Sequence, residues 1–370
     1  MKIREISFHK NFKCTASECS ENCCHGWQIP LNNEDFVRFS NERGVLGLKL
    51  SAYSIIGTNY VFNPNSKTCP FRNKDMLCTL QIKKGHDFIP QACRDYPRFY
   101  RNYREFEERY IDLSCLHGAE MFLSEFENMH LIEYEDEAGS KPCGTNDDAD
   151  FLYALDGTRK MMIQALYEVK DLNALTDTLN RMKRYAELAQ EAFIKGDTGY
   201  LTEKIFDAFA FCMNTDTSSK DFRLFPFSAE IFDKLMHTSF YSDRLKTTQN
   251  TLYKLCRLYY DKYAHILYNE DKWENTAREL LSKYPHLLGH LAAYLIYYLY
   301  QYYFKTYEDY SFRRNILMGI IHMNMVFMLE VIYENEHKSL TSSEKARLIS
   351  VYNRRAFFSE LIMDDMYKCL

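Results

Sequence analysis

Eight cysteines gather in the first 115 residues of this chain. They are Cys14, Cys19, Cys23, Cys24, Cys69, Cys78, Cys93 and Cys115. A deprotonated cysteine is a soft ligand that suits zinc, Cu(I) or an iron–sulfur cluster. Closely spaced cysteines on a loop can converge on one centre, and the separation of Cys69 from Cys78 suits a hairpin or a loop. This density of thiols predicts a site that binds a metal ion or an iron–sulfur cluster.

The competing interpretation is that these cysteines are small buried hydrophobic residues, because free cysteine is often buried. That interpretation explains Cys212, Cys256 and Cys369, each of which is alone in a segment expected to be helical. It explains the adjacent pair Cys23-Cys24 poorly. One tetrahedral zinc or one four-iron cluster needs only four thiolates, so the others pack nearby, support the ligands or serve a second centre.

The spacing leaves the identity of the metal open between zinc and an iron–sulfur cluster. It matches neither a pair of C-x-x-C knuckles nor the bacterial ferredoxin run. His25, His86 and His117 are further candidate ligands, each with an ordinary surface or packing role as its alternative. The glycine-rich, Walker, nucleophile-elbow and zinc-protease motifs are all missing.

The composition narrows the class of protein. The formal net charge is -5 and the sequence has no long basic run, which argues against a nucleic-acid-binding surface. The first residues have no apolar stretch and no small-residue cleavage site, so we expect a cytoplasmic protein. Thiols are kept reduced in that compartment, where clustered cysteines bind metal more often than they form disulfides.

The chain changes character near residue 145. Nine of its twelve cysteines lie before that point, and long periodic segments follow it. We therefore expect a mainly α protein with two parts, a small, irregular cysteine-rich module over 1–144 and an all-α domain over 145–370. The turn-forming segment 141–148 is the expected linker.

Short elements are expected in the first part. The Asn32-Asn33-Glu34-Asp35 string predicts a capped helix that ends at Gly44. Residues 60–62 and 110–113 have the composition of short strands. Loops around the cysteines account for the remainder, and a bound metal can nucleate such a module.

Helices are expected throughout the second part. Asp171 and Gly196 bracket one helix, and a capping box at Thr341–Glu344 opens a last helix that runs to Tyr367. Periodic segments over 242–268 and from 272 to just before Pro285 predict two more.

The most apolar segments, 287–304 and 314–333, should lie at the centre of this domain. Their alternative is a membrane hairpin, since the first has 18 uncharged residues. That segment contains six tyrosines, His290 and Gln301, and the second contains His322 and Asn324. Such polar groups are costly in hydrocarbon, so we expect core helices and no membrane partner. A tyrosine-rich core agrees with the 29 tyrosines of the chain.

Several strings of the first part resemble the flagellin lysine-N-methylase family and, more broadly, zinc- or iron-chelating cysteine-cluster proteins. They are Phe12-Lys13-Cys14, Cys19, Cys23-Cys24-His25-Gly26-Trp27-Gln28-Ile29-Pro30, Cys69-Pro70-Phe71, Leu77-Cys78, Gln81-Ile82, Cys93-Arg94-Asp95-Tyr96-Pro97-Arg98 and Leu113-Ser114-Cys115. The resemblance implies an enzyme of the bacterial flagellum that transfers methyl groups from S-adenosylmethionine to flagellin lysines. It also implies a [4Fe-4S] cluster, with zinc as the alternative. It does not imply standard radical chemistry, because position 26 is glycine.

This reaction suggests roles for residues beside the cysteines. Trp27 and Tyr96, with Phe99, Tyr100 and Tyr103, are candidates for an aromatic wall around a sulfonium or a methylammonium; the alternative is that they pack over the cluster. Arg94 and Arg98 are candidates to hold the donor carboxylate or to offset thiolate charge, with a surface role as the alternative. No catalytic base is evident.

Three classes of function remain at this point. The first is the methyltransferase with flagellin as its partner. The second is a non-catalytic protein that binds a metal or cluster for storage, maturation or redox sensing. The third is a zinc-stabilised module whose helical domain docks a partner.

Overall fold

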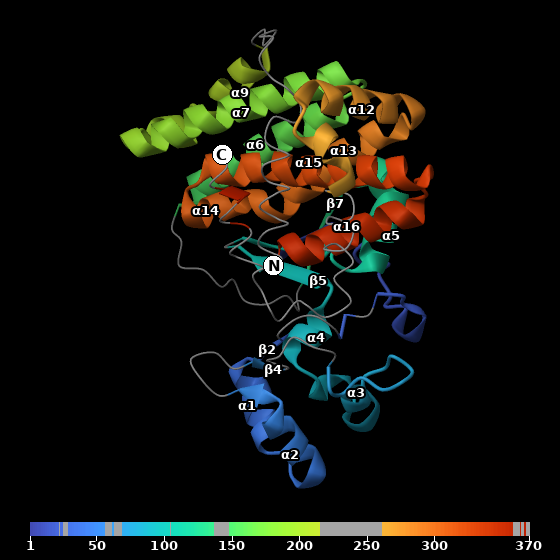
Figure 1. Cartoon of the computed structure of the whole chain (residues 1–370). Coiled ribbons are helices and arrows are strands. Elements are labelled where there is room, and N and C mark those ends of the chain that lie inside the picture. The colour runs from blue at the N-terminus through green and yellow to red at the C-terminus, as the bar shows by residue number, and fades with distance from the viewer. Residues whose placement is uncertain are drawn as a thin grey trace.

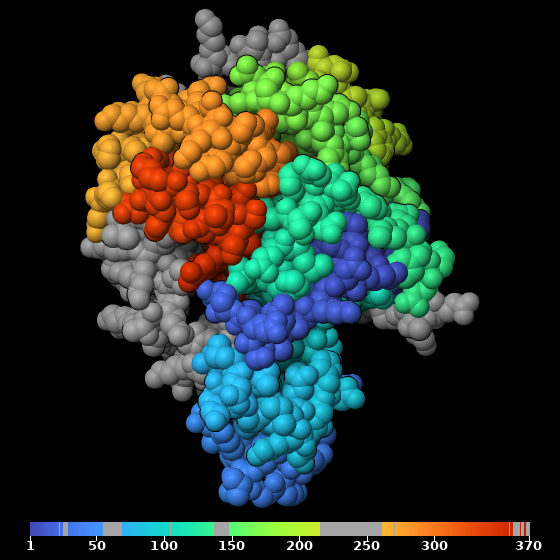
Figure 2. Space-filling model, turned by 90° about the vertical axis from the view of Figure 1, so that its right-hand side faces the viewer, coloured from blue at the N-terminus to red at the C-terminus, as the bar shows by residue number. Residues whose placement is uncertain are grey.

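The computed structural model describes residues 1–21, 23–24, 29–55, 61–62, 69–103, 105–136, 148–214 and 261–357, with residues 363, 366 and 367. Within these residues the protein is mostly helical and contains a small sheet near the N-terminus, in agreement with the expected mainly α class. Figure 1 shows a stack of helices at the top, the sheet beneath it, and a narrower lobe at the bottom. We call the described residues between 29 and 95, which form this narrower part, the small lobe; Figure 2 shows it from the side as the blue and cyan end.

The sheet lies between the small lobe and the helices. Its strands are β1 (Lys2–Ile6), β5 (Arg98–Asn102), β6 (Phe106–Ile111) and β7 (Leu131–Glu135), in the order β5-β6-β1-β7. β1 pairs in parallel with β6 and antiparallel with β7. The strand expected at 110–113 is therefore real but lies earlier in the chain. β1 was not expected, because its mixture of charged and apolar residues does not reveal that both faces of the strand are covered.

The small lobe contains the short elements expected around the cysteines. They are β2 (Ile29–Pro30), α1 (Asn33–Ser40), α2 (Gly44–Ala52), β3 (Ser54–Ile55), β4 (Val61–Phe62), α3 (Thr79–Lys84) and α4 (Gln91–Asp95). Asn32 caps α1 as expected, in a capping box with Asp35. The expected helix end at Gly44 is wrong, because α1 ends at Ser40 and Gly44 opens α2 with a φ of +68°. Glycine is needed there for a turn and not for a stop.

Helices make up the rest of the described chain. They are α5 (Leu116–Glu125), α6 (Ala149–Tyr167), α7 (Leu172–Lys195), α8 (Thr198–Thr202), α9 (Ile205–Asn214), α12 (Glu270–Lys283), α13 (His286–Tyr302), α14 (Thr306–Asp309), α15 (Phe312–His337) and α16 (Ser342–Ala356). The expected cap at Asp171 and left-handed stop at Gly196 are confirmed on α7. The Thr341 capping box is confirmed on α16, which ends at Ala356 and not at Tyr367. Most of the segments expected at 141–148 and 242–268 lies outside the described residues.

α13 and α15 form the centre of the helical layer, as their composition predicted. Most of their side chains are buried, including those of His290, Gln301, His322 and Asn324. Within the described chain, α15 is the one helix long and apolar enough to cross a membrane, and 94 % of its most apolar window is buried inside the protein. Some of the polar groups inside the helices find partners; for example, His322 lies 2.6 Å from the Tyr352 hydroxyl. Both observations agree with core helices.

A single large core joins the sheet to the helices. It includes Phe12, Tyr110 and Phe122 from the first part of the chain, and Leu155 and Phe327 from the second. The domain boundary predicted at residue 144 stays a prediction. The large core contains side chains from both sides of that position. A second, smaller core belongs to the small lobe and includes Cys69, Phe71 and Leu80.

Buried charges fasten the sheet to α6. Arg159 is almost fully buried, and its guanidinium lies 2.6 Å from Glu108 of β6 and 3.2 Å from Asp156. Arg4 of β1 reaches the same Asp156 at 3.0 Å. Charges taken out of water in this way need all of their partners, because an unpaired buried charge is strongly destabilising.

We expect Glu108→Gln to lower the free energy of unfolding by about 3–5 kcal/mol, because it leaves the Arg159 charge buried without its main counterion. Glu191→Gln is the matched control, since it removes an exposed ion pair with Lys195 and should cost less than about 1 kcal/mol. Denaturant unfolding measures both values. Equal, small effects of the two substitutions would show that the buried network does not hold the sheet.

Candidate metal centre

Six of the eight N-terminal cysteines line one cavity at the junction of the small lobe with the rest of the protein. They are Cys14, Cys19, Cys23, Cys24, Cys78 and Cys115. The cavity measures about 150 Å³, the size that accepts a benzene-sized guest. Phe12, Gln81, Tyr96, Pro97 and His117 are among its other walls. Thus the fold brings together thiols that are up to a hundred residues apart in the sequence.

A hairpin presents Cys69 and Cys78, as their spacing suggested. The Asn73 side chain closes its tip by accepting hydrogen bonds from the backbone N–H groups of Asp75 and Leu77, each at 2.9 Å. The backbone N–H of Cys69 donates to the Cys24 carbonyl at 2.8 Å, so the hairpin is fixed to the segment that carries Cys24. Cys69 is buried, and Cys24, Cys78 and Cys93 pack against the same small core.

Cys115 stands at the N-terminus of α5 and is held there by the C-terminal helix α16. The carbonyl of Ser114 accepts hydrogen bonds from the Ser350 hydroxyl at 2.8 Å and from the Arg354 guanidinium at 3.1 Å. The Ser114 hydroxyl lies 3.0 Å from the Tyr96 hydroxyl. α16 therefore positions Cys115 although it is more than two hundred residues away in sequence.

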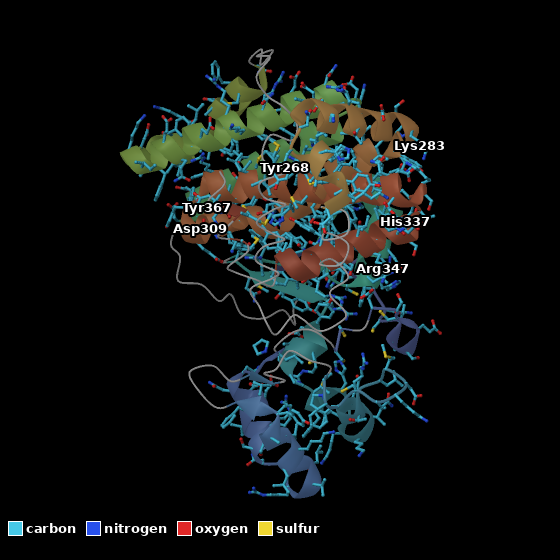
Figure 3. The ribbon with its side chains drawn as sticks, in the orientation of Figure 1. Tyr268, Lys283, Asp309, His337, Arg347 and Tyr367 are labelled. Carbon is cyan, nitrogen blue, oxygen red and sulfur yellow. The ribbon has the colours of Figure 1, made fainter. Side chains whose placement is uncertain are left out.

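The loop with the first cysteines is tied to the same helix. Glu21 lies 3.4 Å from Arg347 and 3.5 Å from Arg354. Figure 3 shows Arg347 on α16, on the side of the helical layer nearest the small lobe. Within the loop, the backbone N–H of Ala16 donates to the Cys14 sulfur at 3.4 Å, and the Cys19 thiol donates to the Glu21 carbonyl at 3.2 Å. An N–H group directed at a cysteine sulfur stabilises a thiolate and is a common feature of metal–sulfur sites.

The surroundings shift the proton affinity of the thiols in opposite directions. Burial raises the pKa of Cys19, Cys69 and Cys93 above the usual thiol value, and raises that of Cys115 to about 12. A hydrogen bond from Cys24, helped by the Arg354 charge, lowers the pKa of Cys23 to about 7. Most of these groups are therefore neutral thiols in the metal-free protein, and a metal that binds them must displace protons.

The donor chemistry fits a metal or an iron–sulfur cluster: several thiols share one cavity, and an N–H group is directed at one of the sulfurs. None of the cysteines that the structure describes is in a disulfide. Within the same residues, no three cysteine, histidine or carboxylate side chains already stand in ligating positions. In this described part of the chain, six thiols therefore lie around one cavity without a preformed set of metal ligands.

Some of the other predicted site residues lie at the cavity, and others lie away from it or outside the described residues. His117 borders the cavity and pairs with Glu120 at 3.2 Å, His86 is exposed on the small lobe, and His25 lies outside the described residues, as does Trp27. Tyr96 lines the cavity.

Both candidate arginines are engaged by neighbouring backbone. Arg94 donates to the Asp87 carbonyl at 2.8 Å, and Arg98 donates to the Phe12 carbonyl at 3.0 Å. Phe99, Tyr100 and Tyr103 lie in or just after β5 and do not line the cavity.

Sequence reasoning missed two residues of the site, Glu21 and Arg354. They are 333 positions apart, and no spacing rule connects them.

Comparison of the sequence with those of known proteins finds relatives of low sequence identity. A flagellar biosynthetic protein FliU of Salmonella muenchen is 23 % identical over 143 residues, which are 35 % of this chain and 82 % of that protein. Two proteins named lysine-N-methylase, from Salmonella choleraesuis and Salmonella typhimurium, are 24 % and 23 % identical over 145 and 139 residues. Those matches span 35 % of this chain and 35 % of each methylase.

Neither a family model nor a solved structure matches the chain. The chain is thus distantly similar, over about a third of its length, to proteins whose names concern lysine methylation and the flagellum.

Asp35 fixes the helix that carries Cys93. Its carboxylate is fully buried and accepts a hydrogen bond from the Gln91 backbone N–H, at the start of α4, at 3.0 Å. It also forms an ion pair with Arg38, whose guanidinium donates to the Phe88 and Ile89 carbonyls. One carboxylate therefore joins α1, α4 and the turn between α3 and α4.

We expect Asp35→Ala to loosen the small core, because a buried hydrogen-bonded group that loses its partner costs about 1–3 kcal/mol. Alkylation of Cys93 in the metal-free protein should then be roughly five- to a hundredfold faster, as measured by mass spectrometry of the peptide that contains it. Glu34→Ala is the control, since Glu34 is the neighbouring exposed carboxylate of the same helix. If Cys93 reacts at the same rate in both variants, Asp35 does not anchor α4.

Proposed function

We propose that this chain is a protein-lysine N-methyltransferase that transfers methyl groups from S-adenosylmethionine to flagellin in the cytoplasm. In this proposal its N-terminal cysteines hold a [4Fe-4S] cluster, with zinc as the alternative. The observation that carries the proposal is the gathering of the cysteines at one cavity in a chain whose distant relatives are named lysine-N-methylase. The matches cover 35 % of each methylase, so activity, substrate and partner are proposals for this chain.

The reaction requires a neutral amine. A lysine ammonium has no lone pair, so it must lose a proton before it can attack the methyl group of a sulfonium. A partly apolar environment lowers the pKa of a buried lysine, and aromatic faces attract the positive charge of the donor and of the product. The cavity walls provide such surroundings through Phe12, Tyr96 and Pro97.

Residues near the cavity have distinct proposed roles. Tyr96, held by Ser114, forms a fixed part of the wall, and Trp27 is proposed to add to it. Arg98 holds the Phe12 carbonyl and so orients the start of the cysteine loop, while the positive charges of Arg94 and Arg98 favour an anionic group of the donor. A bound cluster or metal would order the loop between Cys14 and Cys24. Proximity and orientation of two bound reactants supply about 7–11 kcal/mol of such a barrier.

The decisive experiment gives the anaerobically purified, metal-loaded protein S-adenosylmethionine and flagellin from its own organism. Intact mass spectrometry should show flagellin gaining mass in units of one methyl group, located on lysines. Free lysine should react at least tenfold more slowly, because it lacks the remote contacts that position the amine.

Cys115→Ser should lower both the bound metal and the rate, whereas Cys212→Ser should change neither, since Cys212 is buried in α9 away from the cavity. Metal-loaded protein that leaves its own flagellin unmodified would overturn the methyltransferase proposal. In that case the non-catalytic metal- or cluster-binding function, the second class of the sequence analysis, takes its place.

A further inference from the structure

We infer that the eight cysteines form two separate four-thiolate centres; the inference rests on the proposed metal-binding function and goes beyond it. The lobe centre consists of Cys24, Cys69, Cys78 and Cys93. The junction centre consists of Cys14, Cys19, Cys23 and Cys115. One tetrahedral zinc or one four-iron cluster takes four thiolates, so eight thiols in two sets of four satisfy two centres.

The lobe centre is a unit because its four residues belong to one small core. Cys69 is a member of that core, and the other three pack against it. The hairpin pairs Arg72 with Cys78, and the Cys69 N–H donates to the Cys24 carbonyl at 2.8 Å. Cys93 approaches from α4 and packs against the same core. Its electrostatic neighbours are Cys69 and Cys78, together with Cys23 at the boundary between the two sets.

The junction centre is a unit because its residues face the large core and α16. Cys115 packs against the large core, and α16 fixes both the carbonyl before it and, through Glu21, the loop that carries the other three. Cys115 interacts electrostatically with Cys19 and Cys23, and Cys19 interacts with Cys14 and Cys23. Cys23 thus belongs to the junction centre and the adjacent Cys24 to the lobe centre, so this pair links the two.

Each of the two sets has a cation in its surroundings, and the sets differ in exposure. Four thiolates around a divalent ion carry a net charge of -2, because four negative charges meet two positive ones, and nearby cations favour such a site. The positive charge of Arg354 acts on Cys23 of the junction centre, and that of Lys49 acts on Cys69 of the lobe centre. All four junction residues line the cavity, as do Cys24 and Cys78 of the lobe set. The sets differ in exposure, because Cys14 and Cys23 are exposed whereas Cys69 is buried. The junction centre is therefore the more accessible to a small ligand, and the lobe centre, with Cys69 and Cys93 away from the cavity, is the more enclosed of the two.

Cobalt(II) titration of the full-length, reduced, metal-free protein tests the inference, because tetrathiolate cobalt has strong visible and charge-transfer absorption. Wild type should bind two equivalents with four-thiolate spectra. The double variants Cys14→Ser/Cys115→Ser and Cys69→Ser/Cys78→Ser should each bind one equivalent, and Cys212→Ser should bind two. A wild type that saturates at one equivalent, or a Cys14→Ser/Cys115→Ser variant that binds none, overturns the two-centre assignment.

Protection mapping keeps the test independent of substitutions that unfold the chain. Wild type with one equivalent of zinc is alkylated, digested and mapped, and the protected thiols should all fall within one of the two sets. Protection spread over both sets contradicts the inference. If wild type binds no cobalt, the proposed metal function fails together with it. If two equivalents bind but flagellin is not methylated, only the proposed enzymatic activity fails.

Discussion

The turn between β6 and α5, residues 111–115, is the constraint on which the candidate site depends. It leaves the sheet at Ile111, whose N–H donates to the Tyr297 hydroxyl of α13 at 3.0 Å. At its other end, the Ser114 carbonyl accepts hydrogen bonds from α16. Two helices of the large core therefore decide where Cys115 stands. Since buried backbone groups must be paired, this turn cannot move without breaking contacts in the large core.

The rest of the molecule is arranged around this fixed point. Buried charges among Arg4, Glu108, Asp156 and Arg159 hold the sheet to α6, so the strand that delivers the turn is itself anchored. The small lobe has its own core and meets the remainder at the cavity. Under the proposed metal-binding function, a bound metal would add stabilisation to this lobe, because binding energy becomes folding energy in small cysteine-rich modules. The protein thus combines a helical layer with a small lobe that has a separate core.

The sequence predicted those parts of the fold that rest on local chemistry. The caps at Asn32, Asp171 and Thr341 are side-chain hydrogen bonds within one turn, and each is present. The central helices α13 and α15 follow from their continuous apolar and tyrosine-rich composition. β1 was missed, because a strand becomes recognisable only when its partners β6 and β7, about a hundred residues later, cover it. For the site, the cysteines were identified by type and density, while Glu21 and Arg354 emerge only from the folded chain.

The central claim is that the gathered thiols bind a metal in the native protein. X-ray absorption at the metal edge of anaerobically purified, full-length protein tests it directly, because the first shell reports which atoms touch the metal. The account predicts a first shell of sulfur alone, with four sulfurs per metal atom at about 2.3 Å for zinc. A first shell of nitrogen or oxygen, or protein that carries no metal at the K edges of zinc and iron, would contradict it.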